Sequence, residues 1–482
     1  MGRRKSLEVN MLLNSVNAML RIIFPLITFP YASKVLGVEN IGRYSFSSSF
    51  IGYFVLVAGL GISGYAVREG AKLREDKDRF AKFADSVFTI NILSTAVSYI
   101  LLVLCCVFFD QLREYIPVIA VISANIAFCT LGVEWIYSAQ EDYTYITVRN
   151  IIVRLISIVL LFVFVKNDND LLLYAGVSAF FSVGTGVANY ICAKKYYRPK
   201  FVLDLKQIEF KKHIVPILVM FAMSVSATIY VNSDVTILGI VWGDYTVGIY
   251  SVATKIYDTI KTILSAVIIA AIPHLSARIG EGDLTGFTDK AREVYFLLIT
   301  FLLPAIVGIA VLRKELVILI SDITYIEAAT SLVILCGALL FSICGWFWGH
   351  CVLIPFGKEK TVFYALATAA GVNILLNLFL VPIWQEKAAA VTTLVAELIQ
   401  CGLTVWAAKK YLSATGAGIC AVKSAVGCAG IVAVNMIIKI WQFGCILHTI
   451  TVVVLSVVVY ITIEVMLKNS TVINILKKAA KR

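Results

Sequence analysis

The chain has 482 residues, of which 60% are hydrophobic and 15% are charged, and its mean hydropathy is +0.89. Soluble domains are about half apolar and about a quarter charged, so this composition excludes a soluble globular protein and predicts one that uses lipid as its solvent. The net charge of +12 lies in short basic stretches between apolar segments and at both ends, which is typical of a multi-pass membrane protein and argues against nucleic-acid binding.

The 11 cysteines predict neither a disulfide framework nor a metal site. The sequence has no CxxC pair, and most of the cysteines lie inside apolar stretches, where this residue packs as a small hydrophobe. His274 and His350 are single and lack ligand spacing, so we expect structural roles for them. The apolar stretch after the basic N-terminus contains three Asn and Arg21, so a cleaved signal peptide is not expected.

A helix that crosses the hydrocarbon core needs about 20 mostly apolar residues, and a barrel strand only about 10. The hydropathy pattern therefore predicts fourteen transmembrane helices with short connections and no inserted soluble domain. In chain order they are expected near residues 9–33, 42–66, 83–109, 115–137, 144–165, 170–193, 214–241, 246–272, 293–312, 326–354, 361–383, 387–408, 417–439 and 444–467. The predicted fold class is an all-α integral membrane protein.

Lysine and arginine predict the orientation of these spans. With the N-terminus inside, the inner segments carry 30 of the 42 basic residues, the outer loops carry eight, and four lie within spans. This asymmetry predicts that both termini are cytoplasmic. The basic inner loop 67–82 and the tail KKAAKR are interpreted as segments that face lipid headgroups.

Two short motifs recur six spans apart in the sequence. Gly-x-Tyr-Ser occurs at 42–45 and 248–251, and AKKYY at 193–197 is echoed by AKKYL at 408–412, at offsets of 206 and 215. Six is an even number, so the two copies share the same topology, as in a parallel repeat about an axis along the membrane normal. The alternative interpretation is that Gly-x-Tyr-Ser marks an interfacial tyrosine and a tight helix start.

The repeat divides the chain into four predicted parts. Residues 1–193 form an N-lobe of spans 1–6, 194–213 a cytoplasmic linker, 214–412 a C-lobe of spans 7–12, and 413–482 two extra helices with a basic tail. Two six-helix lobes in parallel are the architecture of an alternating-access transporter. Its substrate site is expected between the lobes, near the membrane midplane.

Polar residues of span 1 share one helical face. Those within a sector of about 60° are Asn10, Asn14, Asn17, Arg21 and Thr28. Pro25 lies one turn after Arg21 and should kink the helix there, so it is the predicted hinge. We interpret this span as a bending helix that lines a cavity; the alternative is an internal helix whose amides bond to neighbouring helices.

Spans 5 and 8 show similar stripes, and both contain basic residues. In span 8 the shared sector of about 100° holds Ser251, Thr254, Lys255, Asp258, Thr262 and Ser265. Lys255 and Asp258 are three residues apart and could pair, while Lys261 lies off the stripe. In span 5, Arg154 shares a face with Thr147, Asn150 and Ser157.

Arg21, Arg154 and Lys255 are all predicted near mid-membrane depth, where charge is costly and usually serves a ligand. Because these cations repel each other, an anionic group is expected to bind among them; Arg offers a planar fork to phosphate and Lys a point charge. The predicted anion- and sugar-binding residues are Arg21, Arg154, Lys255, Lys261, Asn14, Asn17 and Asp258.

The later spans contain unpaired acids and amides. The candidates for ion coupling are Asp234 in span 7, Asn373 and Asn377 in span 11, and Thr393 and Glu397 in span 12. Such oxygen-rich residues could hold Na⁺ or relay protons, and they could equally form a structural hydrogen-bond cluster between helices. No other metal and no cofactor are expected.

Two stretches resemble a known family. Residues 29–71, FPYASKVLGVENIGRYSFSSSFIGYFVLVAGLGISGYAVREGA, resemble the first two spans of bacterial polysaccharide flippases, and residues 237–258, ILGIVWGDYTVGIYSVATKIYD, resemble their seventh-to-eighth span region. These flippases belong to the multidrug/oligosaccharidyl-lipid/polysaccharide exporter (MOP) superfamily. The resemblance covers the whole chain in span count, lobes and termini.

The resemblance implies a transporter that moves undecaprenyl-diphosphate-linked oligosaccharide units, as in O-antigen assembly, to the outer leaflet of the bacterial cytoplasmic membrane. It also implies a groove for the lipid tail along spans 13–14 and a Na⁺ site that Asp234, Asn373, Asn377 and Thr393 match by residue type and span. Because Asn377 stands where an acid would be typical, Na⁺ coupling is in doubt and Glu397 offers a proton route.

Three classes of function compete on the sequence. The flippase is favoured, with lipid-linked oligosaccharide, membrane lipids and other polysaccharide-assembly proteins as expected partners. A multidrug or other lipid-linked-precursor exporter of the same superfamily is the alternative, although drug cations would prefer an acidic cavity. An enzyme is not expected, because the outer loops are short and contain no paired catalytic carboxylates.

Overall fold

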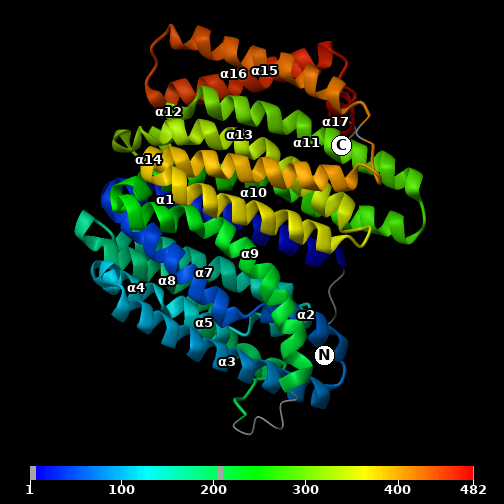
Figure 1. Cartoon of the computed structure of the whole chain (residues 1–482). Helices are drawn as coiled ribbons and strands as arrows, with labels where there is room; N and C mark the ends of the chain where they lie inside the picture. Colours follow the sequence, from blue (N-terminus) through cyan, green and yellow to red (C-terminus); the bar gives the residue numbers. More distant parts are fainter. Residues whose placement is uncertain (1–6, 203–209, 414, 481–482) are drawn as a thin grey trace. The chain divides into compact units, whose positions relative to one another are not determined.

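The computed structural model describes residues 7–202, 210–413 and 415–480, and every regular element among them is a helix (Figure 1). Within this part, twelve helical segments are long and apolar enough to cross a membrane. Two of the twelve hold two predicted spans each, as described below. All fourteen predicted spans are therefore found as helical segments, and the prediction of an all-α membrane protein is confirmed.

Helix α1 (Leu7–Gly59) has 53 residues, which at about 1.5 Å per residue far exceeds a hydrocarbon core of about 30 Å. The helical dihedrals break at Gly37, where φ is 76° and ψ is 176°. This backbone conformation is readily adopted by glycine, since it has no Cβ. The break separates spans 1 and 2. The helix continues through Pro25, and the predicted kink at Pro25 stays a prediction.

Helix α14 (Glu359–Ala408) is a second double span of 50 residues. Here the break lies at Gln385, with φ 55° and ψ −136°. It falls between the predicted spans 361–383 and 387–408 and follows Pro382, which lies inside the helix. A non-glycine residue in this conformation is strained, and the predicted boundary between the two spans does not by itself indicate this conformation.

The structure forms two compact units, residues 1–248 and 249–482. In the first, α1 packs on α3, α7 and α9, and α7 packs on α8 (Figure 1). The predicted span 115–137 is built from three short helices in place of one. After α1, the α-helices of this unit are α2 (Ile62–Leu73), α3 (Lys77–Phe108), α4 (Ile116–Ile122), α5 (Ala124–Leu131), α6 (Glu134–Ala139), α7 (Tyr143–Phe164), α8 (Leu171–Cys192) and α9 (Phe210–Trp242).

In the second unit, α14 packs on α13, α13 on α11, α11 on α15 and α15 on α16. Beyond the predicted spans it contains a short helix, α12, and the predicted span 326–354 ends in a π-helical turn at Phe347–Leu353. Besides α14, its α-helices are α10 (Asp244–Gly280, which begins in the first unit), α11 (Leu284–Val311), α12 (Arg313–Ile320), α13 (Ala328–Trp346), α15 (Ala417–Lys439), α16 (Cys445–Met466) and α17 (Ser470–Ala480).

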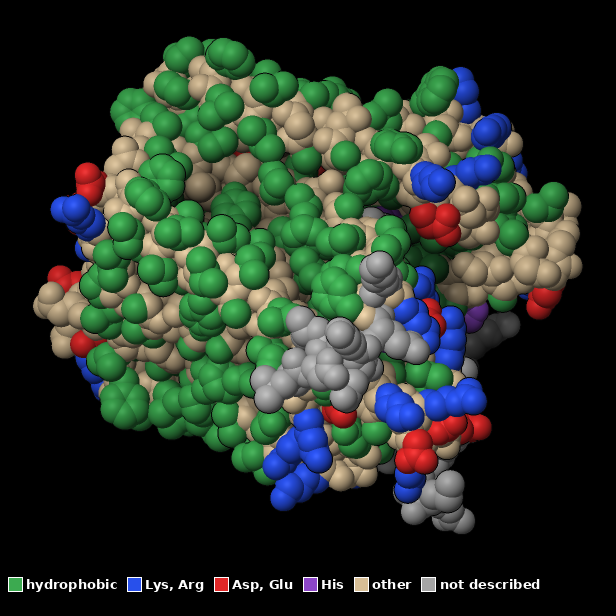
Figure 2. All heavy atoms as spheres, turned by 60° about the horizontal axis from the view of Figure 1, so that its bottom comes forward, with side chains coloured by type: hydrophobic (Ala, Val, Ile, Leu, Met, Phe, Trp, Pro, Cys, Tyr) green, Lys and Arg blue, Asp and Glu red, His purple; other side chains and the backbone are tan. Residues whose placement is uncertain are grey.

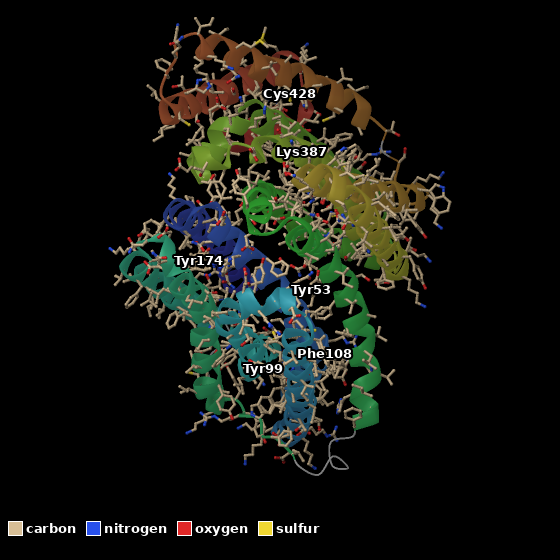
Figure 3. The ribbon with its side chains drawn as sticks, turned by 60° about the vertical axis from the view of Figure 1, so that its left-hand side comes forward. Tyr53, Tyr99, Phe108, Tyr174, Lys387 and Cys428 are labelled. Atoms are coloured by element: carbon tan, nitrogen blue, oxygen red, sulfur yellow. The ribbon has the colours of Figure 1, made fainter. Side chains whose placement is uncertain are left out.

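Helix α9, the predicted first span of the C-lobe, packs on α1 and α2 within the first unit. One polar contact between them joins Tyr53, labelled in Figure 3, to Thr236, with 3.2 Å between the two hydroxyl oxygens. The lobe boundaries at residues 193, 213 and 412 stay predictions.

The surface has the chemistry of a lipid-facing protein. Figure 2 shows hydrophobic side chains over most of the face in view, with charged side chains gathered toward its edges. Individual apolar residues are highly exposed; Phe108 and Met466 expose 75% and 76% of their surface. In water such a surface would aggregate, whereas in a bilayer it meets its natural solvent.

Candidate functional site

The two Gly-x-Tyr-Ser copies make a reciprocal backbone contact. A Cβ placed on Gly42 would lie 1.8 Å from the carbonyl oxygen of Asp244, and one on Gly248 would lie 2.1 Å from that of Val38. Asp244 and Val38 are separated by the repeat offset of 206, as are the two glycines. Each copy therefore places its glycine against the carbonyl that belongs to the other copy.

The backbone conformation just before these two glycines is also repeated. Gly37 and Gly243 are also 206 residues apart, and their φ angles are 76° and 77°. Tyr44 of the first copy packs edge-on against Tyr174 (labelled in Figure 3), with ring centroids 4.6 Å apart. The motif is thus a structural element, and its glycines allow two backbones to approach closely.

An ion pair lies beside this glycine contact. Arg43 Nε lies 3.0 Å from Asp244 Oδ2, and the Tyr115 hydroxyl donates to Asp244 Oδ1 at 2.7 Å. Glu114 lies further out, 3.7 Å from an Arg43 Nη. From the sequence, Arg43 was only one of the basic residues near the outer loops, because its ion-pair partner Asp244 lies 201 residues away. Asp244 also occupies the first turn of α10, where a negative charge is favourable.

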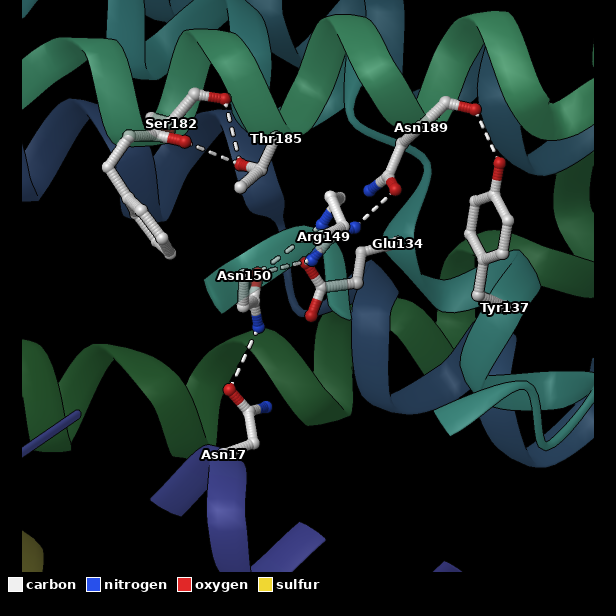
Figure 4. A network of polar contacts seen from close by, with 9 residues as sticks. Asn17, Glu134, Tyr137, Arg149, Asn150, Ser182, Thr185 and Asn189 are labelled. Atoms are coloured by element: carbon white, nitrogen blue, oxygen red, sulfur yellow. Dashed lines mark hydrogen bonds and ion pairs between the residues drawn. The ribbon is translucent and has the colours of Figure 1, made fainter. Parts of the chain in front are cut away.

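A second polar network centres on Arg149 of α7, which is 5% exposed (Figure 4). Its guanidinium donates to Asn150 Oδ1 at 2.8 Å and to Asn189 Oδ1, and it lies 3.1 Å from Glu134 Oε2. The Glu134 side chain is half exposed while that of Arg149 is buried. A buried guanidinium thus has one acidic partner, which reaches it from the surface.

The network extends to span 1. Asn150 Nδ2 donates to Asn17 Oδ1 at 2.9 Å, and Asn17 is 7% exposed (Figure 4). The Thr147 hydroxyl donates to the carbonyl of Leu13 at 3.2 Å, one turn away. The predicted polar faces of spans 1 and 5 therefore meet each other in this unit.

Arg154 lies on α7 above two aromatic rings. Its guanidinium carbon is 4.6 Å from the Phe181 ring centroid and 5.4 Å from that of Phe24, and one Nη donates to the carbonyl of Leu20 at 2.8 Å. A planar guanidinium stacked in this way keeps its positive charge. The side chains of Asn14 and Arg21 lie outside the described residues.

In the second unit, a buried acid pairs with a lysine. Lys261 Nζ of α10 lies 2.9 Å from Glu397 Oε1 of α14, and the Tyr257 hydroxyl donates to the same oxygen at 3.1 Å. Glu397 is 2% exposed. Lys255 lies close enough to Asp258 for their charges to interact, and Asp258 is exposed. The ion pair thus uses the lysine that lies off the polar stripe.

The amides of span 11 form a closed cluster. Asn377 Nδ2 donates to Asn373 Oδ1 at 3.1 Å, and the Thr392 hydroxyl donates to Asn377 Oδ1 at 2.8 Å. All three residues have no exposed surface. The cluster uses Thr392, the neighbour of the predicted Thr393. Its oxygens suit a hard cation but carry no charge, and among the described residues no group of three His, Cys, Asp or Glu side chains could hold a metal.

The family profile described as "Polysaccharide biosynthesis protein" matches residues 8–278, more than half of the chain. The chain belongs to this family. A second profile, described as MatE, matches residues 216–379. The resemblance seen in the sequence is thereby confirmed: this is a member of the polysaccharide flippase family of the MOP superfamily.

Curated relatives of this polysaccharide biosynthesis family member are O-antigen transporters by name. A protein of Escherichia coli (strain K12) named "Putative O-antigen transporter" is 23% identical over 387 residues, covering 79% of this chain and 91% of the relative. One of the same name from Shigella dysenteriae is 24% identical over 264 residues, covering 53% and 63%. The function that these names describe belongs to those proteins.

Solved structures show the same fold. The lipid II flippase MurJ in an inward closed conformation superposes with a TM-score of 0.75, covering 95% of this chain and 99% of MurJ, at 15% identity. An inward-facing multidrug resistance MATE family transporter gives 0.58, covering 83% and 98%, at 14% identity. The family and the fold are thus those of transporters. The MurJ match covers more of the chain than the MATE match.

The structure of this flippase family member brings some of the predicted site residues together within each unit. Asn17 joins the Arg149 network, and Lys261 meets Glu397, while Asn373 meets Asn377. Asp234, 6% exposed, lies on α9 in the first unit, whereas the other four ion-coupling candidates lie in the second.

Sequence reasoning missed two buried charged residues of this flippase family member. Arg149 was counted with the inner basic segments, although it is buried in α7, next to Asn150 and one turn before Val153. Glu464 in span 14 was not singled out, although it is 0% exposed. The signal for both was available, because a charged residue inside an apolar helix usually marks a polar contact.

Proposed function

We propose that this protein flips an undecaprenyl-diphosphate-linked oligosaccharide from the inner to the outer leaflet of the bacterial cytoplasmic membrane, by alternating access. The observation that carries the proposal is a set of cations inside membrane helices: the buried Arg149 and the partly buried Arg154 in the first unit, and the partly buried Lys261 in the second. A diphosphate head group is a ligand that such cations would stabilise. The names of the curated relatives support the same class of substrate.

In the first unit, Arg149 is the residue best placed to exchange partners. Its only acidic contact in the described structure is Glu134, which is half exposed and therefore free to swing away. A phosphate that replaced this carboxylate would keep the buried guanidinium compensated, and Asn150 and Asn189 would hold its orientation. Substrate entry would then need no uncompensated buried charge.

In the second unit, the Lys261–Glu397 pair would couple the same event to a proton. When a phosphate binds Lys261 in place of Glu397, the buried Glu397 loses its ion pair and keeps the hydrogen bond from the Tyr257 hydroxyl. A carboxylate in that environment is costly. Taking up a proton removes this cost. We therefore assign the coupling ion as a proton in preference to Na⁺, because the span-11 cluster is neutral and its two amide oxygens already accept hydrogen bonds from within the cluster.

The glycine contact and the Arg43–Asp244 pair would act as the outer closure. The basic-residue asymmetry predicts that this end of the helices is outside, with both termini inside. Opening on that side would separate residues 38–42 from 244–248. The ion pair holds the closed state, and glycine at positions 42 and 248 allows it to form.

The test is reconstitution in liposomes with defined undecaprenyl-diphosphate-linked sugars, following their leaflet exchange under pH and Na⁺ gradients imposed separately. We expect exchange that responds to the pH gradient and is strongly slowed by Arg149→Ala or Arg154→Ala, in protein that still inserts. Absence of exchange under either gradient would contradict the proposal. Exchange driven by Na⁺ alone would overturn the proton assignment and keep the flippase.

A second candidate is a multidrug exporter, favoured by the MatE profile over residues 216–379. Cations inside the membrane helices would repel a cationic drug, so we expect cells that express the protein to extrude cationic dyes no faster than control cells. Dye efflux abolished by Glu397→Gln would favour this candidate. Other polysaccharide-assembly proteins are proposed partners, to be sought by crosslinking in native membranes.

A further inference from the structure

Helix α16 contains a buried acid that the transport proposal does not use. Glu464 has no exposed surface. Its Oε2 accepts a hydrogen bond from Asn469 Nδ2 at 2.6 Å, and its Oε1 is buried without a hydrogen-bond partner among the described residues. The ion pairs found in the described part of the chain do not include it. Glu397, by contrast, is paired with Lys261.

The pocket around Glu464 is built by close helix packing. A Cβ on Gly427 of α15 would lie 3.3 Å from Glu464 Oε1 and 2.7 Å from the ring of Tyr460, so this glycine makes the room for both side chains. The Tyr460 hydroxyl donates to the carbonyl of Thr300 in α11 at 2.7 Å. The site thus lies where α11, α15 and α16 meet.

The charged and titratable groups that face Glu464 offer it no counter-ion. They are Tyr460 from α16 itself and Cys420 and Cys428 from α15, all of them neutral in their ordinary state. Lys423 of α15 directs its ammonium to the backbone carbonyl of Lys468, at 3.1 Å. A lone carboxylate so buried is far more costly than the neutral acid.

We propose that Glu464 is a proton-binding site, holding a proton on Oε1 and thereby fastening α17 to the helices α11, α15 and α16. The mechanical link is Asn469, which donates to Glu464 and accepts a hydrogen bond from the backbone NH of Thr471 at 3.0 Å, at the start of α17. Val472 of α17 is buried in this arrangement. Loss of the proton leaves a buried carboxylate, which water can reach only if the helices separate.

Infrared spectroscopy of the full-length protein in lipid tests the proton directly. We expect a C=O stretching band of a protonated carboxylic acid at neutral pH, lost in Glu464→Gln and retained in Glu397→Gln, because Glu397 is paired with Lys261. An unchanged band in Glu464→Gln would overturn the proposal. So would failure of this variant to fold, since a neutral amide of the same shape should replace a neutral acid.

Hydrogen exchange of the α17 amides tests the link to the proton. At each pH, wild type is compared with Glu464→Gln, which reports the intrinsic pH dependence of exchange. If opening follows the loss of one proton, wild-type exchange on the alkaline side should rise above that of the variant by about tenfold per pH unit. Equal exchange in the two proteins at every pH would contradict the proposal. Neither readout depends on which substrate is transported.

Discussion

Two buried glutamates of the second unit have opposite environments. Glu397, 2% exposed, accepts hydrogen bonds from Lys261 and Tyr257, whereas Glu464, 0% exposed, accepts one from the neutral amide of Asn469. The first is compensated by a charge and the second can be compensated only by a proton. Equal burial therefore says little about the charge of an acid inside a membrane protein; its neighbours decide that charge.

The largest expected effect separates the two glutamates by the same substitution. Glu397→Gln leaves the Lys261 ammonium without its acid, and we expect a loss of about 3–5 kcal/mol in the free energy of unfolding. Glu464→Gln should change it by less than about 1 kcal/mol, because it replaces one neutral group by another. Equilibrium unfolding in mixed detergent micelles measures both.

A double variant sharpens the first half of that comparison. Adding Lys261→Met to Glu397→Gln removes both charges of the pair, so we expect most of the lost stability to return. If the double variant were as unstable as Glu397→Gln alone, the cost would lie in packing around the Tyr257 hydroxyl and not in the uncompensated charge.

A medium effect is expected from the glycine that makes room for Glu464. Gly427→Ala places a Cβ 2.7 Å from the Tyr460 ring, and we expect about 1–3 kcal/mol of destabilisation from overpacking. Gly402→Ala in α14 is the matched control, because a Cβ there meets nothing within 4 Å and alanine favours the helix. Similar melting temperatures for the two variants would show that α15 and α16 can shift apart freely.

A smaller effect is expected when the Glu464 partner is removed. Asn469→Ala deletes the hydrogen bond to Oε2 and the one that accepts the Thr471 NH, and we expect a loss of about 1–2 kcal/mol, concentrated in α17. Faster hydrogen exchange in α17, with α13 and α14 unchanged, is the measurement. Uniform acceleration in all helices would mean that Asn469 supports the whole unit.

The smallest effect concerns an acid at the membrane surface, Asp142, just before α7. Burial raises its pKa, but hydrogen bonds from Lys195, Tyr196 and the backbone NH of Tyr145 outweigh this, and the net pKa is lowered. An acid whose pKa is lowered on folding stabilises the folded protein at pH values above the ordinary pKa of aspartate. This stabilisation is lost as the pH falls through the pKa of the folded state. Asp142→Asn should cost below about 1 kcal/mol at neutral pH and flatten the acid side of the stability profile.

Most of the fold could be predicted because lipid imposes a length and an apolar composition on every span. All fourteen spans follow from that rule. The breaks at Gly37 and Gln385 fall in the predicted connections 34–41 and 384–386, but the dihedral angles there and the π-helical turn at Phe347–Leu353 could not be predicted, because they depend on packing. A hydropathy window averages over such local features.

Contacts among the candidate site residues could be predicted only in part, because a helical stripe reports on one helix only. The stripe in span 8 favoured Lys255, whereas the ion pair uses Lys261, whose partner Glu397 lies 136 residues away. Arg149 and Glu464 each stand apart from a long stripe, so the search for several polar residues on one face passed them over. Pairing between helices is tertiary information, which a periodicity cannot supply.

The reciprocal contact of Gly42 and Gly248 has a consequence for how the two halves of this chain can diverge. A side chain added at either position would strike the backbone of the opposite copy, which no adjustment of rotamers can relieve. Each copy is thus held to glycine by the main chain of its counterpart, whatever side chains surround it. The two glycines are therefore constrained by backbone geometry, independently of the side chains that each copy of the motif has around it.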